Sequence, residues 1–518
     1  MEKKFYITTP IYYPSGKPHI GTAYTTILAD VIFRYKKLIG FDSYFLTGLD
    51  EHGQKIEQKS KEEGFDSSQA YVDSMVPYFT DLWKKLDINY SQFIRTTNPK
   101  HIDTVQKVFS TMLKNDDIYL GEWKGLYCLG CEEPYNESEA IKKEDGCLYC
   151  RVGHKLSNRT ESSYFFKMAK YTDWIKTYIT SNPDFIYPIK ITHEMLNNFV
   201  NKGLEDLSIS RTTFSWGIPI LENKKHVMYV WLDALFNYVS ALGYLQPDDS
   251  LYQKFWNNDK SQIVHIVGKD IARFHTVFWP ILLHSINLNL PSKVISHSFI
   301  MAEDGRKMSK SFGNVIDPEI ICDKYGSDIF RYYLLKEFVL DSDNCFSEKR
   351  YVELFNSDLA NIYGNIVSRT IGMLRLYNSG KVHLESNILT SEMEKMLKAK
   401  EALLPLIENE INNFNIKEVL TLVNNYAKDI NQYIENSKPW EINKANDKEK
   451  INNFLFILTD AVRTMSILLS PVLVKGCALI NQMMNFTSEM TQYSSINNIN
   501  IIEGLKVNEA SPIYLRIK

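Results

Sequence analysis

The 518-residue sequence contains no charge-free apolar run of membrane-spanning length, and no apolar signal stretch follows its first residues. In the best candidate run, near the C-terminus, Asp460 and Arg463 interrupt the apolar residues. The chain also lacks a large net charge, because 59 basic and 62 acidic residues leave −3. A protein that coats nucleic acid non-specifically should be more basic. With 44% hydrophobic and 23% charged residues, the composition is globular. We therefore expect a cytoplasmic protein of about two to four domains that has no contact with membranes.

Cysteine is scarce, with seven residues in the chain. A small, odd and unevenly spread set is not a disulfide framework. Four cysteines form two Cys-x-x-Cys pairs with fifteen residues between them, Cys128 with Cys131 and Cys147 with Cys150. Each pair can chelate through one tight turn, and four thiolates satisfy tetrahedral zinc with no open position for water. We predict one structural zinc ion; four unrelated thiols and a nucleic-acid-binding zinc ribbon are the alternatives.

Strand-like and helix-like segments alternate in two parts of the chain. Strands are expected over 5–9, 43–47, 262–267 and 293–301, and helices over 20–38 and 271–284. This alternation predicts a parallel, Rossmann-like sheet with both faces covered. Ligands of such sheets bind beyond the carboxyl ends of the strands, where Asp50 and Gly268 stand.

The remaining segments differ from this pattern and suggest a division of the chain. Residues 115–205 contain the clustered cysteines and are interpreted as an insertion into the sheet domain, which then comprises 1–114 and 206–330. A linking segment is expected over 331–354. From 355 to 518 the apolar residues follow three-to-four spacing, which predicts an all-α bundle, with weak strand signals only near 501–517.

Two short motifs fit phosphate binding. His19 and Gly21 lie in the turn between the first strand and its helix, where unpaired N–H groups and a positive dipole end favour an anion. After the last sheet strand, Lys307 and Lys310 stand in the Ser-rich run Lys-Met-Ser-Lys-Ser and could clamp a polyphosphate. Alone, the first could be an ordinary loop histidine and the second a solvated charge cluster.

Together these motifs resemble the class I aminoacyl-tRNA synthetases, and in particular the methionyl-tRNA synthetases. Residues 19–22 are similar to the HIGH signature of that family, with Thr22 at the position where the second histidine is usual, and residues 307–311 match KMSKS letter for letter. The resemblance extends over essentially the whole chain. It implies that His19, Lys307 and Lys310 are catalytic, and that ATP with Mg²⁺ is bound by these residues and by Gly21, Thr22, Gly268, Asp270 and Ser309.

The resemblance also implies an amino-acid pocket and an anticodon site. Asp50 matches the carboxylate that holds the substrate ammonium, and the methionine side chain would contact Ile11, Tyr13, Trp231, Ala234, Leu235, Tyr238 and His275. Positions 231, 234, 235 and 238 share one helical face, and aromatic rings favour a polarisable thioether, although such a stripe could be plain core. Asn365, Arg369 and Trp440 match the positions that read the anticodon; an indole stacks on an unpaired base.

The implied function is that of a methionine–tRNA ligase with methionine, ATP and tRNA(Met), including the initiator, as partners. A relative specific for valine, leucine or isoleucine, a small nucleotidylyltransferase and an RNA-binding zinc protein are the alternatives. About 90 residues of insertion leave little room for an editing domain, and neither of the other two classes would use the whole set of motifs. Dimeric relatives append an extra tRNA-binding barrel, for which the helical bundle leaves too few residues, so we expect a monomer.

Overall fold

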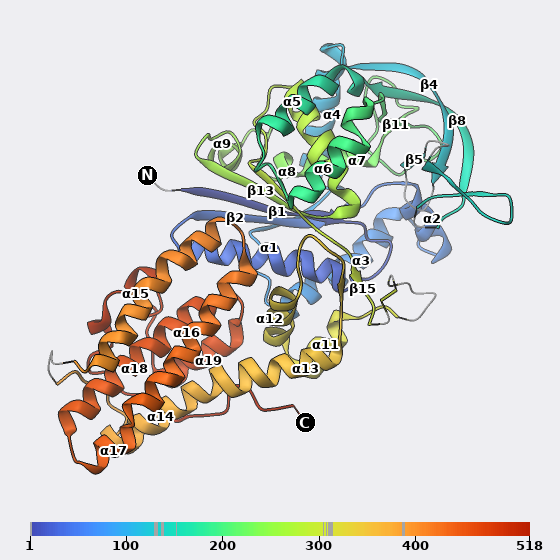
Figure 1. Ribbon diagram of the computed structural model, residues 1–518. Helices are drawn as coiled ribbons and strands as arrows, with labels where there is room; N and C mark the ends of the chain where they lie inside the picture. The colour runs from blue at the N-terminus through green and yellow to red at the C-terminus, as the bar shows by residue number, and fades with distance from the viewer. Residues whose placement is uncertain are drawn as a thin grey trace.

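The computed structural model describes residues 3–128, 133–135, 139–151, 153–303, 305–306, 308, 314–385 and 389–517. Its centre is a parallel sheet with the strand order β3-β2-β1-β13-β14-β9 (Figure 1). The strands in that order are Gln92–Arg95, Asp42–Leu49, Lys4–Tyr12, Ser261–Gly268, Lys293–His297 and Ile186–Tyr187. The predicted Rossmann-like parallel sheet is confirmed.

Alternate residues of the longer strands enter two separate hydrophobic cores. Phe5 and Ile7 of β1 belong to one core, and Tyr6, which lies between them, belongs to the other. Successive side chains of a strand point to opposite faces, so both faces of the sheet are buried. In Figure 1, α1 (Ile20–Leu38) lies between the sheet and the helical bundle, and α4 (Pro99–Lys114) and α7 (Val230–Leu235) lie on the other side.

The predicted insertion is only partly separate from the sheet. β4 (Ile118–Cys128) and β8 (Leu156–Phe166) pair in register along their whole length as an antiparallel ribbon that extends away from the sheet. Further along, β9 pairs with β14 as the last strand of the central sheet, although it falls within residues 115–205. The strand expected over 293–301 is also divided. β14 ends at His297, and β15 (Ile300–Met301) pairs with β16 (Asn344–Cys345) in a second small sheet.

The C-terminal region is helical, as predicted. A π-helical stretch (Phe355–Gly364) leads into α14 (Asn365–Asn378), followed by α15 (Ser391–Asn412), α16 (Ile416–Ser437), α17 (Pro439–Lys444), α18 (Lys448–Leu469) and α19 (Val474–Met484). The weak strand expectation near 501–517 was wrong. Residues 499–502 form a 3-10 turn. Residues 504–507 make backbone hydrogen bonds with 380–382, but this pairing amounts to one isolated bridge between Lys381 and Lys506, because the partner segment is too short to form a ladder. Among the described helices, none is long and apolar enough to cross a membrane.

Candidate functional site

The first turn of α1 lies at the carboxyl edge of the sheet, directly after β1. His19 is the N-cap of this helix, and its Nδ1 accepts a hydrogen bond from the backbone N–H of Gly21 at 3.0 Å. Thr22 Oγ1 accepts from the backbone N–H of His19 at 3.5 Å, which completes a capping box. A Cβ at position 21 would lie 2.9 Å from His19 Cε1, so the imidazole can occupy this place only beside glycine. Thr22 therefore has a capping role in place of a second imidazole.

The end of β14 meets this turn through a histidine that the sequence motifs did not indicate. His297, at the end of β14, receives a hydrogen bond at Nε2 from Thr25 Oγ1 of α1 at 2.7 Å, and is paired in register with Gly268. A Cβ at Gly268 would lie 2.5 Å from Asp270 Oδ1, so the glycine admits that carboxylate. Burial lowers the pKa of His297, which keeps the ring neutral. Because the sequence predicts one strand over 293–301, no local signal placed His297 at a strand end.

Two contacts involve side chains that were predicted to line the amino-acid pocket. Trp231 of α7 stacks on Phe274 with ring centroids 3.6 Å apart, and Phe274 begins the π-helix Phe274–Phe278. Next to it, the Tyr238 hydroxyl lies 2.7 Å from His275 Nε2. Burial lowers the pKa of His275 to about 4, so the ring is neutral near pH 7. Its Nδ1 donates to the Ile271 carbonyl at 3.0 Å, which leaves Nε2 to accept the Tyr238 proton.

The other predicted pocket residues lie on neighbouring elements. Ala234 and Leu235 are buried on α7, and Ile11 lies near the end of β1, opposite Gly48 of β2. Asp50 directly follows β2, and its backbone N–H donates to the Tyr12 carbonyl at 2.9 Å.

Burial raises the pKa of Tyr238, and the negative charge of Asp50 contributes to the rise. Tyr13 differs from the rest of the predicted set. It packs against a small separate cluster around Tyr71 and Met75.

Lys307, Ser309 and Lys310 lie outside the described residues. The segment that leads to them is β15, which is held against β16 of the linking segment. After β15 the chain turns through Gly305, whose φ of 75° suits glycine, and Gly305 N donates to the Ala302 carbonyl. The described residues that precede the motif thus follow closely on the end of β14.

A possible metal site lies at the tip of the β4–β8 ribbon. Cys128 Sγ, Cys150 Sγ and one imidazole nitrogen of His154 lie within 4.8 Å of one another, and both cysteines are buried. Thiolate and imidazole donors are those that zinc prefers, so this set fits a zinc ion. In the part of the chain that is described, Cys147 is not a member of this group and contacts Lys155 instead. Cys131 lies outside the described residues. His154 was absent from the predicted ligand set.

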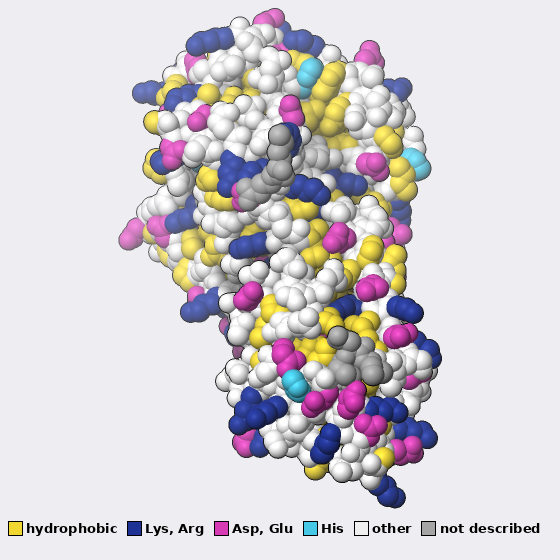
Figure 2. All heavy atoms as spheres, turned by 90° about the vertical axis from the view of Figure 1, so that its left-hand side faces the viewer, with side chains coloured by type: hydrophobic (Ala, Val, Ile, Leu, Met, Phe, Trp, Pro, Cys, Tyr) yellow, Lys and Arg dark blue, Asp and Glu magenta, His cyan; other side chains and the backbone are white. Residues whose placement is uncertain are grey.

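The predicted anticodon residues lie on the surface of the helical bundle. Asn365 is exposed at the start of α14, and Arg369, one turn later, forms an ion pair with Glu435 of α16 at 2.7 Å. Trp440, at the beginning of α17, is 46% exposed. On the face shown in Figure 2, basic and acidic side chains are interspersed over the bundle. Contact with RNA there would depend on particular residues and not on a broad basic field.

The chain was compared with known proteins. The family model for class I tRNA synthetases (M) matches residues 5–371. A methionine–tRNA ligase of Ureaplasma parvum is 47% identical over 100% of this chain and 98% of its own length, and that of Bacillus subtilis is 42% identical over 99% and 78%. The solved structure of Mycobacterium tuberculosis methionyl-tRNA synthetase in complex with methionyl-adenylate is 32% identical. It superposes with a TM-score of 0.93 over 99% of this chain and 100% of that chain.

Proposed function

The chain belongs to the methionyl-tRNA synthetase family of class I tRNA synthetases, and on this premise we propose that it is a methionine–tRNA ligase. In the first step the methionine carboxylate attacks the α-phosphorus of ATP, so that methionyl-adenylate forms and pyrophosphate leaves. In the second step a terminal ribose hydroxyl of tRNA(Met), the initiator included, takes the methionyl group, and AMP leaves. The product serves protein synthesis in the cytoplasm.

The first step requires no general base, because the attacking carboxylate is already an anion. Catalysis then depends on positioning and on stabilisation of the charge that develops on the phosphates. For methionine, Asp50 would hold the ammonium, and the Trp231, Tyr238 and His275 side chains would contact the thioether. The neutral state of His275 supports this role, since a charged imidazolium would be a poor neighbour for an apolar side chain.

For ATP, the residues of the α1 turn and the strand ends would form the nucleotide site. His19 at the helix N-terminus can donate from its Nε2, since its Nδ1 already accepts from Gly21. Gly21, Thr22, Gly268 and Asp270 would line the site, and Lys307, Ser309 and Lys310 would contact the phosphates. Mg²⁺ bound to ATP would neutralise part of the phosphate charge.

For tRNA, Asn365, Arg369 and Trp440 would read the anticodon on the bundle, far along the chain from the sheet site. One zinc ion would hold the tip of the ribbon together, with Cys128 and Cys150 among its ligands. Cys131 and Cys147 complete the set that the sequence predicts. We further propose that the chain acts as a monomer.

The observation that carries the proposal is the group of side chains in which Trp231 stacks on Phe274 and the Tyr238 hydroxyl is hydrogen-bonded to the neutral His275. It is tested by ATP–pyrophosphate exchange with each of the twenty amino acids in turn. Exchange that depends on methionine alone is the expected result. Exchange with valine, leucine or isoleucine would indicate a different specificity, and exchange that needs no amino acid would indicate a nucleotidylyltransferase.

A further inference from the structure

A buried carboxylate of α7, the helix that carries Trp231 and Ala234, lies between two imidazoles. Asp233 of α7 is fully buried, and its Oδ2 lies 2.6 Å from Nδ1 of His52, while its Oδ1 lies 2.7 Å from Nε2 of His101. Both histidines are themselves buried. The three residues come from different elements, since His52 follows β2, His101 belongs to α4 and Asp233 to α7.

The proton positions in this network follow from its geometry. An ionised carboxylate only accepts hydrogen bonds, so each imidazole must donate from the nitrogen that faces Asp233. Burial alone would raise the pKa of Asp233, but the two imidazoles hold it below its ordinary value. The second nitrogen of His101, Nδ1, lies 2.7 Å from the Ser240 hydroxyl of α8 (Asn237–Ser240). The network thus joins four elements with every imidazole orientation defined.

These elements carry both ends of the proposed methionine site. His52 is two residues from Asp50, and the intervening Glu51 is buried and paired with Arg95 at 2.6 Å. Trp216 adds to this anchoring, since its Nε1 donates to the Glu51 carbonyl at 2.6 Å. On the other side, Asp233 lies directly between the pocket residues on its helix, Trp231 and Ala234. A shift at Asp233 would therefore move the pocket wall relative to the carboxylate that holds the ammonium.

We propose that Asp233, together with His52 and His101, is the positioning centre that fixes α7 relative to Asp50 and thereby determines the affinity for methionine. The proposal deepens the methionine–tRNA ligase function and rests on it. A buried charge with two partners is a poor source of stability, because desolvation offsets much of the attraction and well-packed apolar residues often replace such groups without loss. The hydrogen bonds of the network are directional, so they permit only one placement of the three elements relative to one another.

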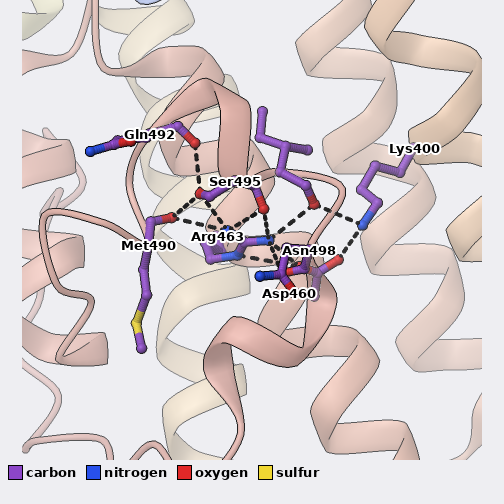
Figure 3. Close-up of polar contacts among 8 residues, drawn as sticks. Lys400, Asp460, Arg463, Met490, Gln492, Ser495 and Asn498 are labelled. Carbon is purple, nitrogen blue, oxygen red and sulfur yellow. Dashed lines mark hydrogen bonds and ion pairs between the residues drawn. The ribbon is translucent and has the colours of Figure 1, made fainter.

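The bundle contains a network that serves as a matched control. Asp460 of α18 is equally buried and accepts hydrogen bonds from Lys400 at 2.6 Å and Arg463 at 2.7 Å (Figure 3). Arg463 also donates to the carbonyls of Met490 and Ser495, which ties the following segment to the bundle. This network contains none of the proposed methionine or ATP residues. Its disruption tests what the loss of a buried carboxylate does in general.

The experiment compares variants that keep or remove one hydrogen bond. In Asp233→Asn the amide can accept from one imidazole only and turns its NH₂ toward the other. In His101→Gln the amide nitrogen can take the place of Nε2 and donate to Asp233, whereas His101→Met keeps the volume and loses the donor. Steady-state pyrophosphate exchange gives KM for methionine and for ATP, and thermal unfolding shows whether each variant is folded at the assay temperature.

We expect Asp233→Asn and His101→Met to raise KM for methionine about tenfold or more, with KM for ATP unchanged, since small displacements of a site have effects of this size. His101→Gln keeps a hydrogen-bond donor to Asp233, so its KM for methionine should stay within about twofold of the wild-type value. Asp460→Asn should lower Tm and leave KM for methionine unchanged. A folded Asp233→Asn with normal KM for methionine would overturn the proposal, as would equal effects of His101→Gln and His101→Met. If Asp233→Asn does not fold, the comparison of His101→Gln with His101→Met tests the proposal. Failure of the underlying function would be seen separately, as wild-type protein that shows no methionine-dependent exchange.

Discussion

The guanidinium of Arg331, on α12 (Ser327–Glu337), donates to the carboxylate of Asp30 on α1 at 2.6 Å, and both side chains are fully buried. The same guanidinium donates to the carbonyls of Pro471 and Val472, which precede α19. One side chain thus joins the helix that begins at the proposed ATP site to the helical bundle. The two halves of the molecule are held together there by directional hydrogen bonds as well as by a continuous apolar core.

Replacement of Arg331 should therefore destabilise the whole chain. Arg331→Met leaves Asp30 buried with a reduced set of partners, and loss of one partner of a buried pair costs about 3–5 kcal/mol. Urea unfolding should show a decrease of this size in the free energy of unfolding. The double variant Asp30→Asn with Arg331→Met should lose less than the two single losses together, because the two residues interact directly. Strict additivity would show that the pair contributes no coupling.

The ligands of the proposed metal site can be identified by measuring the zinc content of variants. Cys150→Ser should lower the zinc content of purified protein and destabilise the ribbon tip, because binding energy for a structural zinc is also folding energy. The spacing of the cysteines predicts Cys147 as a ligand, whereas the geometry places His154 beside Cys128 and Cys150. Metal analysis of Cys147→Ser and His154→Ala decides between them, since only the variant that lacks a true ligand should lose zinc. Protein with no zinc and an undisturbed Cys150→Ser variant would contradict the assignment altogether.

Lys310 should act on the transition state of adenylate formation. Lys310→Ala should reduce the single-turnover rate by an amount that corresponds to about 2–4 kcal/mol, the scale for one electrostatic donor, with little change in methionine affinity. Lys398→Ala, at an exposed position on α15, is the matched control and should behave as the wild type. A Lys310 defect confined to KM for methionine would count against this role.

The stability of the fold should depend on pH through Lys36. Its ammonium is buried near the rings of Phe41 and Phe414, and burial, with a contribution from Lys3, lowers its pKa from 10.5 to about 8. Between these two values the unfolded chain holds a proton that the folded chain has released, so this group stabilises the fold progressively as pH rises. The stability difference between Lys36→Met and the wild type should therefore shift in favour of the wild type by about 2 kcal/mol from pH 7.5 to pH 9.5. Urea unfolding at both pH values measures it, and Lys398→Met should show no such shift.

The elements that the sequence predicts well are those with long, regular patterns. The helix over 20–38 was predicted with its observed bounds, because its apolar residues recur at helical spacing and Gly40 ends it. β9 has only two residues, too few to form any pattern, and it joins the sheet because β14 offers it a free edge. In the same way, the bend after His297 divides one apolar run into two strands that pair with different partners.

The candidate site shows the same difference between local sequence patterns and contacts between distant residues. Residues that belong to contiguous motifs, such as His19 and Gly21, could be proposed as site residues from the sequence alone. Asp233 lies 181 residues from His52 and 132 from His101, and no local pattern connects them. Their association is set by the packing of α4 and α7 on one face of the sheet. The contact of His154 with two cysteines likewise depends on how the ribbon tip folds.

Trp440 tests the role of the bundle. It is the second residue of a six-residue helix and is 46% exposed, whereas Ile442 on the same helix is buried in the core. Trp440→Ala should leave methionine-dependent pyrophosphate exchange almost unchanged, because that reaction needs no tRNA. Aminoacylation should fall by an amount that corresponds to about 1–3 kcal/mol, the value of one base–aromatic stack, with the loss in kcat/KM for tRNA.

The competing explanation is that Trp440 only packs against the bundle. Its exposure makes this the weaker alternative, and Ile442→Ala provides the comparison, since a buried side chain removed from the same helix should lower Tm. Trp440→Phe keeps a ring that can stack and should recover most of the charging activity, while Trp440→Ala should keep a near-normal Tm. Exchange, charging and thermal unfolding measured on one preparation of each variant separate the two roles. A stable Trp440→Ala that charges tRNA normally would remove this residue from the recognition site, and one that melts as early as Ile442→Ala would assign it to the core.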